Sequence, residues 1–210
     1  MNKKNSLAII LAITLTVLLI ISGCAQDSDD DKGSDSTATE LEGTWNKACS
    51  YNSTALMDIL ESFVFSGESY HMYNYFYDTT NDSCGGTLNL VQDGIMTFSI
   101  GNALDPTTDL KEIDITLTDL TYTPKSNAGI TLANTDCSGD VVFTAMDETK
   151  SVKGFACDHL STVPLNTTLY SVYRLNTSVT PNVLQFGDVK TSIAERPTTI
   201  AVSADSHIKQ

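Results

Sequence analysis

The side chains with the greatest capacity for chemistry in this sequence are five cysteines and three histidines. Their spacing fits neither a metal centre nor a nucleophilic site. No two cysteines are separated by the two to four residues typical of zinc ligands, and the signature motifs of hydrolases, metalloproteases and nucleotide-binding enzymes are missing from the sequence. The adjacent thiol and imidazole of Cys157-Asp158-His159 would lie on opposite faces of a strand. We therefore expect neither catalysis nor a bound metal.

Cys24 stands apart from the other cysteines because it follows a segment that looks like a targeting signal. Lys3 and Lys4 precede the uncharged, mostly aliphatic run 7–21. This run is shorter than the roughly 20 residues that a membrane-spanning helix needs. A short positive start, a short apolar core and small residues before a cleavage point are typical of a signal peptide.

The end of that run, Ile21-Ser22-Gly23-Cys24, resembles the lipobox of bacterial lipoproteins. The resemblance implies that residues 1–23 are a removed signal peptide and that Cys24 carries a diacylglycerol on sulfur and an acyl chain on its new amino group. Several acyl chains on one residue give a stable membrane anchor. Ala25 stands where an Asp would favour inner-membrane retention, so the resemblance indicates the outer membrane of the cell envelope. The alternative is an uncleaved signal anchor.

The segment that follows, residues 24–42, is strongly acidic. It holds seven acids against one base, no aromatic residue and one large aliphatic residue, Leu41. Such a composition cannot offset the entropy lost on ordering, so we expect a flexible tether. Asp27, Asp29 and Asp31 alternate, but the Gly and Glu that a calcium loop requires are missing. The net charge of the whole chain, -14, disfavours a nucleic-acid partner.

Four cysteines remain for disulfide bonds once Cys24 is lipidated. An exported protein lies in an oxidising compartment, and four cysteines allow three pairings. The order of the expected strands returns Cys84 to the end of the sheet where Cys49 lies. In a later expected hairpin, Cys137 precedes the first strand and Cys157 follows the second, so both lie at the same end of that hairpin. We predict the bonds Cys49–Cys84 and Cys137–Cys157.

Alternation of period two from residue 43 onward predicts an all-β domain of about nine strands. Asp93-Gly94 is typical of a hairpin turn. The segment 53–61 could instead be a helix capped by Ser53, but we favour a strand. The expected strands are 43–49, 55–65, 69–77, 87–92, 95–100, 112–122, 140–146, 151–156, 168–175 and 183–186. This pattern fits an antiparallel up-and-down barrel of about 8–9 strands, or a β-sandwich.

The start of the domain, Gly43-Thr44-Trp45, resembles the Gly-x-Trp motif at the entry of the lipocalin (calycin-type) barrel, and Trp45 is the only tryptophan. In that superfamily the tryptophan closes the base of the barrel against a late arginine. The candidates are Arg174 and Arg196. The resemblance implies a lipocalin-like barrel over residues 43–200, with 201–210 as a tail. It brings no defined activity and no cofactor beyond the lipid on Cys24.

The strand at 69–77 is the candidate ligand-binding element because aromatic side chains occupy both of its faces. A barrel interior lined by one of these rows could hold a small apolar or amphiphilic ligand. The candidate lining residues are Tyr70, Met72, Tyr73, Tyr75, Phe76 and Tyr77, and the alternative is that they fill the core. The leading hypothesis is a non-catalytic, membrane-anchored ligand carrier. The alternative is an envelope protein-interaction module with a filled barrel, such as an adhesin or assembly lipoprotein.

Overall fold

The structure, a computed structural model, describes residues 39–53, 56–79, 83–105, 107, 109–137, 141–153, 155, 157, 166–201 and 204–210. The expected signal peptide, Cys24 and most of the expected tether lie outside this range. No helix in the described residues is long and apolar enough to cross a membrane.

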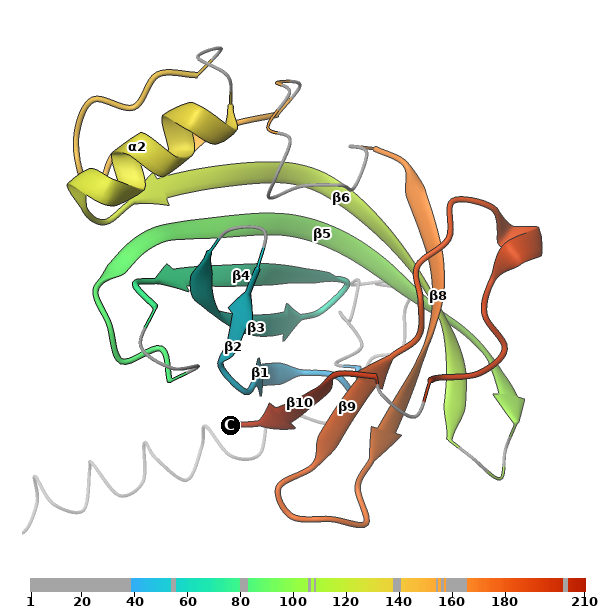
Figure 1. Cartoon of the computed structure of the whole chain (residues 1–210). Coiled ribbons are helices and arrows are strands. Elements are labelled where there is room, and N and C mark those ends of the chain that lie inside the picture. Colours follow the sequence, from blue (N-terminus) through green and yellow to red (C-terminus); the bar gives the residue numbers. More distant parts are fainter. Residues whose placement is uncertain are drawn as a thin grey trace, which may run out of the picture. The chain divides into compact units, whose positions relative to one another are not determined.

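Eight antiparallel strands form a closed up-and-down barrel (Figure 1). They are β1 (Gly43–Lys47), β3 (Met57–Ser66), β4 (Ser69–Tyr77), β5 (Leu88–Asp105), β6 (Leu110–Pro124), β8 (Thr168–Asn176), β9 (Val183–Phe186) and β10 (Ser206–Lys209). Each pairs with the next, and β1 closes the ring because it pairs with both β3 and β10. The all-β barrel expected from the sequence is confirmed, and the β-sandwich alternative is wrong.

Three short elements lie beside this ring. Strand β2 (Ser50–Asn52) extends the pairing of β3, and β7 (Lys150–Ser151) pairs with β6. A turn of 3-10 helix, η1 (Ile193–Glu195), lies in the long connection from β9 to β10. This connection leaves the ring and returns to it (Figure 1).

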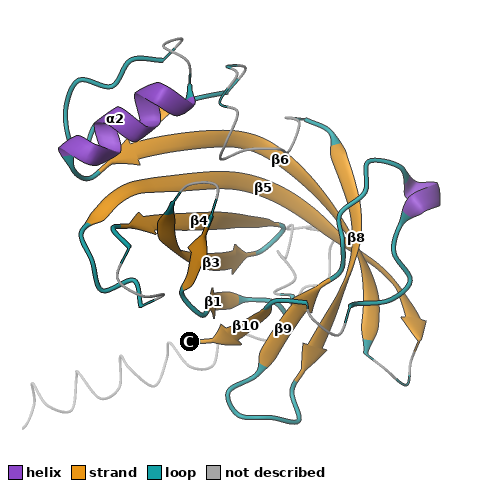
Figure 2. Ribbon diagram, in the orientation of Figure 1, coloured by secondary structure: helices purple, strands orange, loops and turns teal. Residues whose placement is uncertain are grey.

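The helix α2 (Asn127–Asp136) was not expected from the sequence, and it lies against the ends of β5 and β6 (Figure 2). The Ser126 hydroxyl caps it by accepting from the Gly129 amide at 3.0 Å. Gly129 itself packs so close to β5 that an added Cβ would lie 1.7 Å from the Asn89 carbonyl oxygen. The helix was missed because it is short and only weakly amphipathic, so no clear 3.6-residue apolar pattern marks it.

Several expected strand boundaries are wrong. Asp93 and Gly94 are not a turn: β5 runs through them, paired with Tyr73 and Met72 on one side and with β6 on the other. The described residues 141–149 are not a strand, and among the described residues of the strand expected at 151–156 only Ser151 is in a strand, at the end of β7. The segment 57–61 does belong to a strand, as preferred.

Both ends of the expected domain also need correction. Residues 206–209 are β10, a strand of the barrel, rather than part of a tail. At the other end, Leu41 is fully buried and the Glu40 carboxylate accepts hydrogen bonds from Lys111 and Tyr173, so the last residues of the expected tether belong to the folded barrel. The ordering of Leu41 is explained by burial of its side chain in the core.

The interior contains two apolar clusters. The larger one lies within the barrel around Trp45, Phe65, Phe98 and Tyr173. The second, around Phe76, Tyr122 and Phe143, packs α2 and the segment after it against β4, β5 and β6. The disulfides Cys49–Cys84 and Cys137–Cys157 are confirmed. The second of these bonds lies in the second cluster and ties the end of α2 to the chain beyond β7.

Candidate functional site

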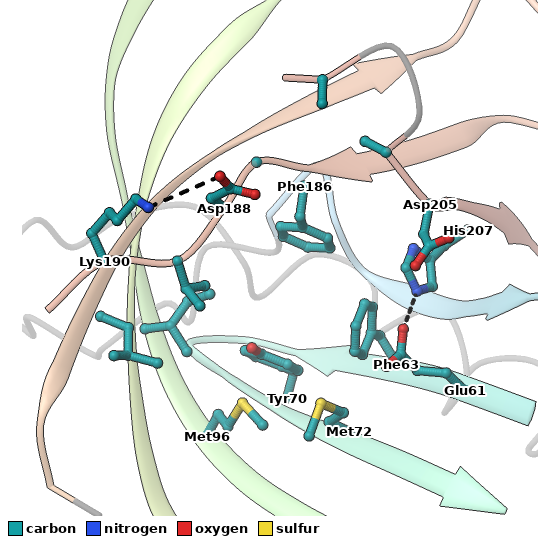
Figure 3. A pocket seen from close by; sticks show the side chains of 16 residues that line it. Glu61, Phe63, Tyr70, Met72, Met96, Phe186, Asp188, Lys190, Asp205 and His207 are labelled. Atoms are coloured by element: carbon teal, nitrogen blue, oxygen red, sulfur yellow. Dashed lines mark hydrogen bonds and ion pairs between the residues drawn. The ribbon is translucent and has the colours of Figure 1, made fainter. Parts of the chain in front are cut away.

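A cavity of about 730 Å³ opens into the barrel interior, and it is the candidate functional site (Figure 3). Inward-facing side chains of seven strands reach it, together with the connection between β9 and β10. The apolar part of its wall includes Phe63, Tyr70, Met72, Met96, Ile115 and Leu169. A concave, mostly apolar site with a few polar groups is the usual form of a small-molecule site.

The alternation of side chains along β4 decides which of the candidate lining residues reach this cavity. Tyr70 and Met72 point inward and line it. Phe76 also points inward, but it is 1% exposed and belongs to the second apolar cluster. The remaining three, Tyr73, Tyr75 and Tyr77, occupy the opposite face and do not line the cavity, since side chains two residues apart share a face.

The outward face of β4 carries a row of stacked rings instead. His71 stacks on Tyr73 with ring centroids 5.6 Å apart, and Tyr73 stacks on Tyr75 at 5.9 Å. The His71 ring also lies within 2.9 Å of a carboxylate oxygen of Asp93. Burial raises the pKa of Tyr73 and Tyr75, with smaller contributions from nearby Asp93 and from neighbouring tyrosines.

The aromatic side of the cavity is closely packed. The Tyr70 ring stacks on Phe65 at 4.6 Å and meets Phe63 edge-on at 5.8 Å, while Phe63 meets Phe186 edge-on at 5.5 Å. Burial, reinforced by the charge of Glu61, raises the pKa of Tyr70 above its ordinary value of 10. Tyr70 is therefore a neutral phenol at physiological pH, as an apolar cavity wall requires.

The polar part of the wall contains two pairs on different sides of the cavity (Figure 3). His207 Nε2 lies 2.7 Å from Glu61 Oε1, and the Asp188 carboxylate lies 4.0 Å from Lys190 Nζ. Because a carboxylate only accepts, His207 Nε2 carries the hydrogen. His207 is 3% exposed and stacks on Phe63 at 4.4 Å, so it is a wall residue and not part of a loose tail.

His207 was missed as a site residue by sequence reasoning because the last strand is only four residues long and has polar neighbours. The only indication in the sequence was that His207 and Lys209 are two residues apart, the spacing of side chains that share one face of a strand. Asp205 also lines the cavity, and its carboxylate forms an ion pair with Lys47 at 2.5 Å.

The arginines do not close the barrel as the lipocalin resemblance implied. The cation over the Trp45 ring is Lys209, 5.2 Å from its centroid, and the Trp45 indole donates to the Leu41 carbonyl at 2.7 Å. Arg174 shares the outward face of β8 with Tyr170, so it cannot reach the inward-facing Trp45. Arg196 stacks on Tyr170 at 5.4 Å from outside the barrel.

Arg196 instead fastens the connection between β9 and β10 to the outer wall. Its guanidinium pairs with Glu112 at 2.6 Å and with Asp114, both on β6. Its side chain is only 10% exposed. The pairing holds in place a segment that forms part of the cavity wall.

One group of described residues has metal-ligand chemistry in close proximity: Asp136, Cys137 and Cys157, whose ligand atoms lie within 4.8 Å of one another. Both cysteines are joined in a disulfide, so neither offers a thiolate. The Asp136 carboxylate accepts from the Tyr122 hydroxyl at 2.8 Å. The cluster is structural in this state.

Comparison with known proteins returned no family model that matches the chain. No curated protein is significantly similar to it either. The class of protein is defined by the structure alone: a closed, eight-stranded antiparallel barrel with an internal cavity.

Proposed function

We propose that this protein is a lipid-anchored lipoprotein of the bacterial cell envelope that binds or carries a small apolar or amphiphilic ligand in a lipocalin-like barrel, without catalysis. The observation that carries the proposal is the open cavity of about 730 Å³ with its aromatic and methionine wall. Methionine side chains are flexible and polarizable, so they adapt to apolar ligands of varied shape.

Membrane attachment rests on the sequence around Cys24. The signal-like residues 1–23, the small residues before the cysteine and the acidic segment after it all support lipidation at that position. In this proposal the acidic segment spaces the barrel from the membrane surface, and Ala25 directs the protein to the outer membrane.

The experiment is native mass spectrometry, with lipid extraction, of protein purified from its own envelope. We expect a mature chain that begins at Cys24 with the added mass of acyl groups, and a second, non-covalent mass that extraction releases. Protein that carries the acyl groups but no releasable mass, at every purification condition tested, would count against a carrier. A chain that retains residues 1–23 would count against lipidation.

The second candidate function, a protein-interaction module, is favoured by one observation: the ring row His71, Tyr73 and Tyr75 on the outer wall is only partly buried. Partly exposed aromatic side chains are enriched at protein interfaces. Replacing Tyr73 and Tyr75 with Ser distinguishes the two candidates, because it would abolish partner capture by an interaction module and leave ligand binding in the cavity unchanged.

A further inference from the structure

The polar groups of the cavity restrict the charge of the ligand. Three carboxylates reach the cavity, from Glu61, Asp188 and Asp205. Against them stands Lys190, the only Lys or Arg among the described lining residues. Neither arginine lines the cavity, so the guanidinium fork that suits a carboxylate or a phosphate is missing from the described wall.

The His207 ring adds a second, independent constraint. Its side chain is 4% exposed, and its Nδ1 atom is buried without a hydrogen-bond partner in the described structure. Nε2 carries the hydrogen that is donated to Glu61, and in the tautomer with this single ring hydrogen Nδ1 presents a lone pair. A buried acceptor without a partner is costly, and a ligand that donates a hydrogen bond would satisfy it.

The aromatic rings beside this pair suit a positive charge. Phe186 meets Phe63 edge-on and is only partly buried, whereas Phe63 is buried with one ring face against His207. The face of an aromatic ring attracts a cation, and the attraction grows when water is excluded. The carboxylate of Glu61 lies at the same part of the wall and favours the same sign of charge (Figure 3).

We infer that the ligand of this cavity is a cationic amphiphile, with an apolar body and a protonated amine that lies near Glu61, His207 and Phe63. This inference rests on the proposed function and deepens it. A fatty acid is the contrasting ligand, because its carboxylate would meet three carboxylates against a single lysine, Lys190.

The test compares head groups on one twelve-carbon tail. Dodecylamine, dodecanol and dodecanoate are each titrated, at about pH 8 and below the concentration at which they form micelles, to displace the neutral fluorophore N-phenyl-1-naphthylamine from the purified protein. We expect dodecylamine to bind about tenfold more tightly than dodecanol, and dodecanoate to bind more weakly than both.

Glu61→Gln is the informative variant, because its amide oxygen still accepts from His207 while the charge is lost. It should reduce the advantage of dodecylamine over dodecanol to about twofold or less. Glu195→Gln is the matched control: it removes the same charge from the exposed η1, away from the cavity, and should leave the advantage unchanged.

The outcomes separate the inference from the function on which it rests. Dodecanoate binding as tightly as dodecylamine, while the fluorophore still binds, would overturn the inference and leave the proposed function standing. A full dodecylamine advantage in Glu61→Gln would also overturn it, since the preference would then come from overall charge. Failure of the fluorophore and of all three amphiphiles to bind would overturn both.

Discussion

His207 on the last strand donates from Nε2 to the Glu61 carboxylate on β3, 2.7 Å away and 146 residues earlier in the sequence. The strand between them in the barrel is β1, so this one hydrogen bond spans the place where the ring closes. The same ring stacks on Phe63. One side chain therefore both bridges the closure of the barrel and forms part of the cavity wall.

The first prediction concerns this closure. His207→Ala should lower the free energy of unfolding by about 1–3 kcal/mol, because it removes a hydrogen bond to a charged group and a buried ring. The measurement is chemical denaturation under non-reducing conditions. Ile208→Ala is the matched control: it is the neighbouring residue on the opposite face, 39% exposed, and should cost much less. Equal losses for the two variants would contradict this role of His207.

Trp45 is expected to act in stability rather than in binding. It is fully buried, and Trp45→Ala should lower the free energy of unfolding by about 3–5 kcal/mol. Lys209→Met removes the cation over the ring and should cost at most about 1–2 kcal/mol. Thermal melting followed by circular dichroism checks both. A Trp45→Ala variant that melts like the wild type would contradict a stabilising role for Trp45 in the barrel core.

The disulfide at the end of α2 should stabilise the fold without shaping the cavity. Replacing Cys137 and Cys157 together with Ala should lower the free energy of unfolding by about 3 kcal/mol in the chain-entropy model. Binding of N-phenyl-1-naphthylamine should not change, because the bond lies in the second apolar cluster and does not line the cavity. Loss of binding in a variant that still folds would show coupling between the two regions.

Alkaline pH should unfold the barrel through its buried tyrosines. Burial raises the pKa of Tyr70, Tyr122 and Tyr173 above 10, and nearby carboxylates add to the effect: Glu61, Asp136 and Glu40 respectively. The folded state then holds these phenol protons more tightly than the unfolded state does. The stability from this source is full below about pH 10 and is lost as the pH rises further.

Ultraviolet absorbance of phenolate, recorded together with near-ultraviolet circular dichroism, checks the prediction. Part of the phenolate signal should appear only as the folded structure is lost. Titration of all eight tyrosines near pH 10 in a protein that remains folded would contradict the burial of these three hydroxyl groups.

The barrel was predictable because its evidence is local and repeats along the chain. Alternation in β4 and β8 marked strands with two distinct faces, and the expected order of the strands paired Cys49 with Cys84. The bond Cys137–Cys157 was also predicted correctly, but from two expected strands of which the described residues contain only β7. Asp93-Gly94 was misread because a glycine in a strand resembles a turn when the pairing partners on both sides are unknown. Here Gly94 lies where an added Cβ would be 3.0 Å from the Met96 methyl carbon.

The candidate site was harder to predict because its residues come together only when the barrel closes. Alternation showed that Tyr70 and Met72 share a face but gave no indication of which face points inward. The pairing of β10 with β1 brings His207 to Glu61, and a four-residue strand at the chain end carries too little pattern to reveal this. The cation over Trp45 was misassigned for the same reason, since Lys209 belongs to that strand.

The central claim, a cavity that binds apolar ligands, is tested most directly by titrating N-phenyl-1-naphthylamine into the wild type and two tryptophan variants. Met72→Trp narrows the cavity with a larger ring, whereas Tyr73→Trp, the next residue along β4, places the same side chain on the outer face. We predict saturable binding to the wild type, unchanged binding to Tyr73→Trp, and a loss of at least about tenfold in affinity for Met72→Trp. Equal binding to all three proteins, or no saturable binding to the wild type, would contradict it.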